Sequence, residues 1–144
     1  MTIDEMVADA KTRVRVVSPD ELRQELDRGE TLVLDVRDVR ERWQLGTIPG
    51  ARHAPRGMLE FWADPTSQYH KPFLDPGKRT VLYCAGGARS ALAADALQKL
   101  GYTDVAHLEV GFNGWRDTGG AVEQVPVPDE FRAGGRGESP KREA

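Results

Sequence analysis

The stretch TVLYCAGGARSALAADALQKL, residues 80–100, contains the pattern that decides the fold. Its first five residues form a continuous apolar run, which is typical of a parallel strand covered on both faces. Small residues and two glycines follow, and the helix-like segment that comes next ends at Gly101. The residues expected on the packed side of that helix are Leu92, Ala93, Ala96, Leu97 and Leu100. The segment predicts a strand, a tight loop and a helix, with the chain's one cysteine, Cys84, at the end of the strand.

Strand-like runs alternate with helix-like segments in both directions from this stretch. Apolar runs at 14–17, 31–36 and 104–109 predict three further strands, and residues 111–123 contain a short helix around Trp115. Such alternation predicts an α/β fold around a mainly parallel sheet.

The helix between the first two strands has clear boundary signals. Ser18 is an N-cap residue, Pro19 suits the first helical position, and Glu21 completes a capping box. Gly29 is placed to end the helix in a left-handed conformation.

The chain divides into a domain and two flanking segments. Residues 1–13 predict a short helix or an N-terminal arm, residues 14–125 the domain, and residues 126–144, which are rich in Pro, Gly and charge, a disordered tail. Within the domain, residues 56–79 contain three of the nine prolines and four aromatic residues. They predict a long irregular loop with a lid or binding role.

The composition excludes several classes of function. A chain of 144 residues suits one domain, and a net charge of −3 provides no general attraction for nucleic acid or anionic membranes. The sequence has no run long enough to span a membrane, and the first residues lack the apolar core of a signal peptide. A single cysteine cannot form an internal disulfide, so the expected compartment is the cytoplasm.

The setting of Cys84 favours a reactive thiolate. The carboxyl edge of a parallel sheet is where open α/β folds bind ligands. Gly86 and Gly87 let the backbone curl so that several N–H groups point at one spot, and the helix that follows adds its positive end. The alternative is that Cys84 is a small apolar residue at the end of a strand.

At this point the sequence resembles the rhodanese family. The family's active-site pattern is a cysteine, four residues and commonly Arg-Ser, and here Cys84 is followed by AGGA, Arg89 and Ser90. Three further markers resemble LVLDVRD (32–38), GTIPGARHAP (46–55) and HLEVGFNGWRDTGGAVE (107–123). The resemblance covers roughly residues 14–125 and implies a five-stranded, mainly parallel sheet flanked by helices on both faces.

The resemblance also implies a chemistry, sulfur transfer without a cofactor. Cys84 attacks the outer sulfur of thiosulfate or a persulfide donor and becomes a persulfide, from which cyanide, a thiol or a sulfur-acceptor protein removes the sulfur. The residues expected to bind the substrate are Ala85, Gly86, Gly87, Ala88, Arg89 and Ser90. Related cysteine phosphatases place five residues between Cys and Arg, and the four residues here form a tighter ring that suits a single sulfur atom.

Arg89 and Ser90 each leave two roles open. Arg89 either binds an anionic substrate or pairs with a carboxylate, Asp35 or Glu41, and thereby braces the loop. Asp35 alternatively stabilises a turn. Ser90 either contacts the persulfide or forms only a local bond in the first helical turn.

The aromatic loop and the histidines are weaker signals. Trp62, Tyr69 and His70 either wall the sulfur pocket or form a satellite core beneath the loop. His53 and His107 are expected to be structural. No spacing of histidine and cysteine predicts a metal site.

Residues 85–88 carry no charge. Rhodaneses that use thiosulfate well often have Lys or Arg in this loop, so a persulfide or protein-bound donor fits at least as well. The alternatives to a small-molecule sulfurtransferase are a persulfide carrier for a partner protein and a non-enzymatic module for binding or redox sensing.

Overall fold

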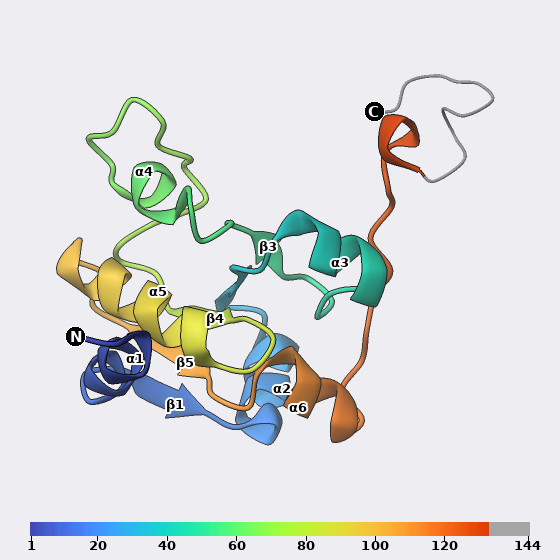
Figure 1. The fold of residues 1–144 in the computed structure, drawn as a ribbon, viewed down its shortest axis with the longest axis horizontal. Coiled ribbons are helices and arrows are strands. Elements are labelled where there is room, and N and C mark those ends of the chain that lie inside the picture. The colour runs from blue at the N-terminus through green and yellow to red at the C-terminus, as the bar shows by residue number, and fades with distance from the viewer. Residues whose placement is uncertain (133–144) are drawn as a thin grey trace.

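A computed structural model describes residues 1–132 and shows a five-stranded sheet (Figure 1). The strand order is β1-β5-β4-β2-β3, and every pairing between neighbouring strands is parallel. The strands are β1 (Arg15–Val17), β2 (Leu32–Asp35), β3 (Arg52–His53), β4 (Thr80–Tyr83) and β5 (Val105–Leu108). The predicted α/β class and parallel sheet are confirmed.

Helices are present where the sequence predicts them after Ser18, after the cysteine loop and around Trp115, and a further helix at Leu59–Ala63 interrupts the predicted irregular loop of residues 56–79. The helices are α1 (Ile3–Lys11), α2 (Pro19–Arg28), α3 (Val39–Leu45), α4 (Leu59–Ala63), α5 (Ala88–Lys99) and α6 (Gly111–Asp117), followed by the 3-10 turn η1 (Asp129–Phe131). The capping box of α2 is present, since the Glu21 N–H donates to Ser18 Oγ at 3.1 Å and the Ser18 N–H to Glu21 Oε1 at 2.8 Å. Gly29 ends α2 with φ of 74°.

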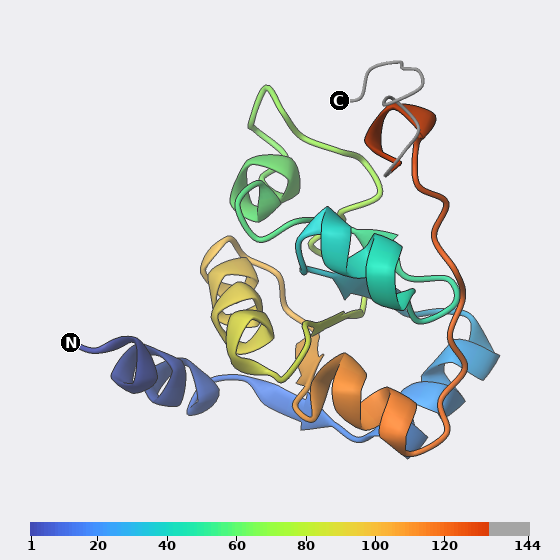
Figure 2. The same cartoon turned by 45° about the vertical axis from the view of Figure 1, so that its right-hand side comes forward.

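The direction of the chain across the sheet decides which face each helix covers. The step from β1 to β2 crosses the sheet one way, and the steps from β3 to β4 and from β4 to β5 go the other way. Because crossovers between parallel strands are right-handed, α2 lies on one face and α4 and α5 on the other (Figures 1 and 2). Helix α6 joins α2, so both faces are covered.

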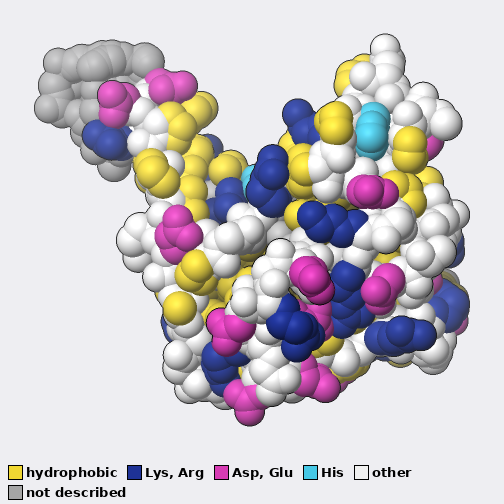
Figure 3. All heavy atoms as spheres, turned by 180° about the vertical axis from the view of Figure 1, so that it is seen from behind, with side chains coloured by type: hydrophobic (Ala, Val, Ile, Leu, Met, Phe, Trp, Pro, Cys, Tyr) yellow, Lys and Arg dark blue, Asp and Glu magenta, His cyan; other side chains and the backbone are white. Residues whose placement is uncertain are grey.

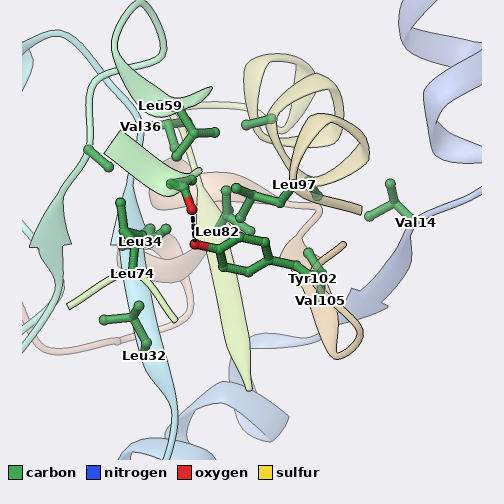
Figure 4. Packing of buried hydrophobic residues seen from close by; sticks show 14 of the residues in the cluster. Val14, Leu32, Leu34, Val36, Leu59, Leu74, Leu82, Leu97, Tyr102 and Val105 are labelled. Atoms are coloured by element: carbon green, nitrogen blue, oxygen red, sulfur yellow. Dashed lines mark hydrogen bonds between the residues drawn. The ribbon is translucent and has the colours of Figure 1, made fainter. Parts of the chain in front are cut away.

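Each face of the sheet has its own apolar core. The cluster under α4 and α5, shown in Figure 4, includes Leu34, Leu82 and Leu97. Within it the Tyr102 hydroxyl donates to the Ala63 carbonyl at 2.9 Å and ties α4 to the end of α5. The opposite cluster contains Phe112 and Trp115 of α6.

The predicted packed side of α5 is partly wrong. Leu92 and Ala96 are only half-buried, whereas Ala91 and Ala94 are fully buried. The reason is that α1 packs against α5 in addition to the sheet, so that two sides of the helix are covered. Small alanine side chains permit that close approach.

Both flanking segments of the domain are described at least in part. Of the two alternatives for residues 1–13, the structure has a helix, and Arg13 after it donates to Asp95 of α5 from Nε and Nη2, both at 2.9 Å. At the other end, the Phe131 ring lies 5.4 Å from the Trp43 ring between centroids. The rest of the predicted disordered tail, residues 133–144, lies outside the described residues.

A buried ion pair organises the carboxyl edge of the sheet beside β4. Asp35 at the end of β2 accepts from the Arg37 backbone N–H and Nε, both at 3.0 Å, and from Arg37 Nη2 at 2.8 Å. Tyr83 of β4 donates its hydroxyl to the same carboxylate at 2.9 Å, and Arg42 Nε donates at 3.1 Å. The carboxylate therefore joins two strand ends to the segment that contains α3.

Two glycines allow the loop after β4 to pack against the loop after β5. A Cβ atom on Gly87 would lie 2.2 Å from the Glu109 carbonyl oxygen, and one on Gly111 would lie 2.2 Å from the Ala85 carbonyl oxygen. Both glycines have positive φ, 108° and 70°. The close approach of the two backbones thus excludes a side chain at either position.

The surface is of mixed charge. On the face in Figure 3, Lys and Arg side chains are interspersed with Asp and Glu. Among residues 1–132, no helix combines the length and the apolar character that a membrane span requires.

We predict that Gly111→Ala displaces the loop after β4. The added methyl group overlaps the Ala85 carbonyl oxygen, so the free energy of unfolding falls by more than in Gly29→Ala, where φ is similarly positive and no atom lies within 4 Å of the new Cβ. The control change is worth about 1 kcal/mol. Urea unfolding of the two variants measures the difference, and equal losses would contradict the close packing.

We predict that Asp35→Asn destabilises the fold at neutral pH by about 3 kcal/mol, because it leaves the buried Arg37 guanidinium without a countercharge. Burial raises the pKa of Asp35, but the bonds from Arg37 outweigh burial and hold the pKa below its usual value. The carboxylate therefore stabilises the fold above its unfolded-state pKa of about 3.9, and this contribution is lost as the pH falls through the folded-state pKa.

Urea unfolding at pH 7 and at pH 3 checks both statements. The difference between wild type and Asp35→Asn is expected to shrink at the lower pH. Glu60→Gln, at the exposed pair with Arg56, is the control and is expected to leave stability unchanged. A stability of Asp35→Asn equal to that of wild type at pH 7 would be the contrary result.

Candidate active site

Cys84 directly follows the central strand β4 and is buried, with 1% of its surface exposed. Its carbonyl oxygen accepts a hydrogen bond from the Phe112 N–H at 2.8 Å, and the Asn113 N–H donates to the Ala85 carbonyl at 3.1 Å. The first turn of α6 therefore holds the start of the cysteine loop in place.

Backbone N–H groups of the loop point at the Cys84 sulfur. The Gly87 N–H donates to Sγ at 3.1 Å, and the Ser90 N–H donates at 3.4 Å. Helix α5 begins at Ala88, so its positive end lies at the same place. Ala85 and Gly86 donate to no backbone acceptor within residues 1–132. This arrangement suits a negatively charged sulfur.

Arg89 pairs with Glu41. Its Nη1 and Nη2 donate to the two carboxylate oxygens at 2.7 and 3.0 Å, a two-point contact between α5 and α3. This pairing lowers the pKa of Glu41 and raises the pKa of Arg89. Glu41 is also held by the capping box of α3, where its Oε2 accepts from the Asp38 N–H at 3.0 Å.

Of the two carboxylates proposed for Arg89, Asp35 is not the partner. It is fully buried and its bonds go to Arg37, Arg42, Tyr83 and Thr47. The bond from the Arg37 backbone N–H agrees with the alternative role in a turn. Asp35 therefore affects the site indirectly, because it holds the segment that leads into α3, the helix that contains Glu41.

Ser90 is fully buried and lies closer to the sulfur than a purely local role requires. The distance between Sγ and the Ser90 hydroxyl oxygen is 3.7 Å, and the same hydroxyl donates to the Gly87 carbonyl at 3.2 Å. It also lies 2.8 Å from Nδ1 of His107 on β5. The sequence indicated His107 only as a structural residue. The signal in the sequence that could have indicated its contact with Ser90 is that His107 is a polar residue within an otherwise apolar strand.

Of the three residues proposed as a pocket wall, Trp62 packs against the core of the domain, and Tyr69 and His70 make their described contacts within their own loop. Trp62 packs against the α5-side core with Lys71 Nζ 4.7 Å from its ring centroid, and the Tyr69 ring meets Phe61 edge-on at 6.2 Å. Nε2 of His70 lies 3.1 Å from the Leu74 carbonyl oxygen. Trp62 thus joins the main core on this face of the sheet rather than a separate satellite core, and the role of the three residues in a pocket stays a prediction.

The other chemistry-bearing residues are dispersed. His53 contacts the Arg37 carbonyl through Nε2 at 2.8 Å. No group of three His, Cys, Asp or Glu side chains able to hold a metal ion occurs in residues 1–132.

Comparison with known proteins agrees with this geometry. The profile of the Rhodanese-like domain matches residues 18–118. A probable adenylyltransferase/sulfurtransferase, MoeZ of Mycobacterium tuberculosis, is 38% identical over 100 residues, which are 69% of this chain and 24% of MoeZ. The chain thus spans about a quarter of the length of this relative.

Solved structures have the same fold. RPA3614 of Rhodopseudomonas palustris, a protein of unknown function and possible tyrosine phosphatase, superposes with a TM-score of 0.82 at 42% identity, covering 85% of this chain and 95% of RPA3614. The human single-domain sulfurtransferase TSTD1 gives 0.62 at 28% identity, covering 72% of this chain and 96% of TSTD1. The profile matches most of this chain, and Cys84 stands at the start of the expected loop. The chain therefore belongs to the Rhodanese-like domain family.

Proposed function

We propose that the protein is a sulfurtransferase that carries sulfur as a persulfide on Cys84. The Cys84 thiolate attacks the sulfane sulfur of the donor. A new S–S bond forms, and the donor's own S–S bond breaks, so that sulfite or a thiolate leaves with the bonding electron pair. A thiophilic acceptor then attacks the outer sulfur, and Cys84 departs as the thiolate.

The observation that carries the proposal is the convergence of N–H groups on Sγ. Gly87 and Ser90 donate to the sulfur itself, and the neighbouring amides of the loop lie at the positive end of α5. Negative charge is present on this sulfur before attack, moves to the outer sulfur in the persulfide, and develops again as the acceptor reacts. Oriented donors in a buried site stabilise all of these anions.

The pairing of Arg89 with Glu41 affects which class of sulfur donor the site can bind. Both guanidinium nitrogens that face α3 are bonded to Glu41, and residues 85–88 carry no charge. Arg89 is thus the one side-chain cation in residues 85–90, and Glu41 offsets its charge, which weakens its attraction for the sulfonate oxygens of thiosulfate. A persulfide, small or attached to a protein, fits this loop better, and that favours the persulfide-carrier role as the second candidate.

The phosphatase description of RPA3614 is not transferred to this chain. Four residues separate Cys84 from Arg89, one fewer than in the cysteine phosphatases, and Arg89 is committed to Glu41. Hydrolysis of a phosphotyrosine analogue is the assay that tests this view, and we expect none.

We predict that treatment with a sulfur donor adds one sulfur atom to Cys84. Intact mass measurement is expected to show a gain of about 32 Da, the atomic mass of sulfur, which cyanide removes. Cys84→Ser is the matched control and is expected to show no gain, because the serine hydroxyl forms no persulfide.

The donor distinguishes the alternatives. Thiosulfate and a small persulfide are compared at equal concentration, and we expect the persulfide to label faster. Labelling by neither donor would overturn the proposal and favour a module that binds or senses without sulfur transfer. Equal labelling of Cys84→Ser would show that the sulfur resides elsewhere.

We predict that Arg89→Ala lowers both the melting temperature and the rate of sulfur transfer, because the cysteine loop loses its bridge to α3. Glu41→Gln retains the shape of the partner but removes its charge, and it is expected to have a smaller effect in the same direction. Full activity of Arg89→Ala with an unchanged melting temperature would contradict the bracing role.

A further inference from the structure

Three buried side chains connect the central strands of the sheet to α5 and meet at the reactive sulfur. Nδ1 of His107 lies 2.8 Å from Oγ of Ser90, which in turn lies 3.7 Å from Sγ of Cys84. His107 and Ser90 are entirely buried, and Cys84 is 1% exposed. Water does not compete with protein groups for these bonds, so the position of each proton follows from the partners present.

The Ser90 hydroxyl has one proton and three neighbours. It can donate to the Gly87 carbonyl at 3.2 Å, to Sγ when the sulfur is an anion, or to Nδ1 of His107 if that nitrogen is unprotonated. Only one of these bonds can exist at a time. The tautomer of His107 therefore decides whether the Ser90 proton is available to the sulfur.

The opposite ring nitrogen of His107 indicates which tautomer is present. Nε2 is buried and has no hydrogen-bond partner within residues 1–132. A proton on Nε2 would be a buried donor without an acceptor, and it would oblige Ser90 to donate to Nδ1. A proton on Nδ1 instead donates to Ser90 Oγ and frees the hydroxyl proton.

We propose that His107 is a positioning residue for Cys84, which holds the Ser90 hydroxyl as a donor to the sulfur by donating its own Nδ1–H to Ser90 Oγ. While Cys84 is a thiol, its S–H donates to Ser90 and the Ser90 proton lies toward the Gly87 carbonyl. When the thiol ionises, its proton leaves to solvent and the Ser90 hydroxyl turns to the thiolate. Gly87 keeps a partner in the Ala91 N–H at 3.2 Å. No proton is transferred along the chain.

The surroundings of His107 agree with a neutral imidazole ring. Burial lowers the pKa of His107, with Glu109 raising it and Lys11 lowering it further. Arg89 is the charged group that interacts with Cys84. Since His107 stays neutral near pH 7, it acts through the direction of a hydrogen bond rather than as an acid or a base.

The inference rests on the proposed role of Cys84 as nucleophile, but its tests need no sulfur donor. If the measurements below succeed and no donor labels Cys84, only the sulfurtransferase proposal fails. If Cys84 is labelled and these measurements fail, only the role of His107 is lost.

The tautomer is measured first, on the unmodified full chain. A long-range nitrogen–proton correlation spectrum of the 15N-labelled protein shows which ring nitrogen carries the proton, and His107→Asn identifies the signals of His107 among the three histidines. We expect the proton on Nδ1. A proton on Nε2 would overturn the proposal whatever the behaviour of any variant.

The effect on the sulfur is measured as the rate of iodoacetamide alkylation against pH, which reports on Cys84 alone because the chain has one cysteine. An asparagine amide reaches the position of Nδ1, whereas a glutamine amide reaches only that of Nε2. We expect His107→Asn to keep the wild-type profile. His107→Gln and Ser90→Ala should each move its midpoint up by about one pH unit, the size of one hydrogen bond to a charged group.

The double variant Ser90→Ala/His107→Gln completes the test. Because both residues act through the same hydroxyl, its midpoint is expected to equal that of either single variant. A further shift in the double variant, equal shifts in His107→Asn and His107→Gln, or a shift in His107→Gln without one in Ser90→Ala would each contradict the proposal.

Discussion

The carboxylate of Asp35 is the point on which the carboxyl edge of this sheet depends. It is a fully buried charge, and it is stable there because Arg37 pairs with it and Tyr83 and Arg42 complete its hydrogen bonds. Through these contacts the ends of β2 and β4 and the segment leading to α3 are held in one arrangement. From this segment Glu41 on α3 reaches Arg89 in the first turn of α5. The stability of the fold and the shape of the sulfur site therefore share one buried ion pair.

The cysteine loop is held on three sides by groups of different kinds. The backbone after β5 lies against it at Gly87 and Gly111, where no side chain fits. Glu41 ties its far end to α3, and His107 of β5 contacts Ser90. A loop of small, neutral residues would be free to adopt many conformations on its own. Its single conformation is imposed by neighbours that come from separate parts of the chain.

Features that depend on local sequence could be predicted, and features that depend on register could not. The cap at Ser18, the stop at Gly29 and the strand before Cys84 are encoded within a few residues, and the structure has all three. For the partner of Arg89 the sequence left two carboxylates open, because only the packing of α3 separates Glu41 from Asp35. The contact of His107 with Ser90 requires β5 to lie beside β4 in one register. The packed side of α5 was partly misjudged because nothing in the sequence of α5 shows that α1 packs against it.

Two of the donors to the Cys84 sulfur, at Gly87 and Ser90, are main-chain N–H groups, and this has a consequence for how the site responds to its surroundings. A peptide N–H does not titrate, so these two donors are the same in acidic and in alkaline solution. Nor can any exchange of side chains at residues 85, 86 or 88 delete a peptide N–H, short of introducing proline. Substitutions at these positions therefore change side chains beside the sulfur while the peptide N–H groups of the loop remain.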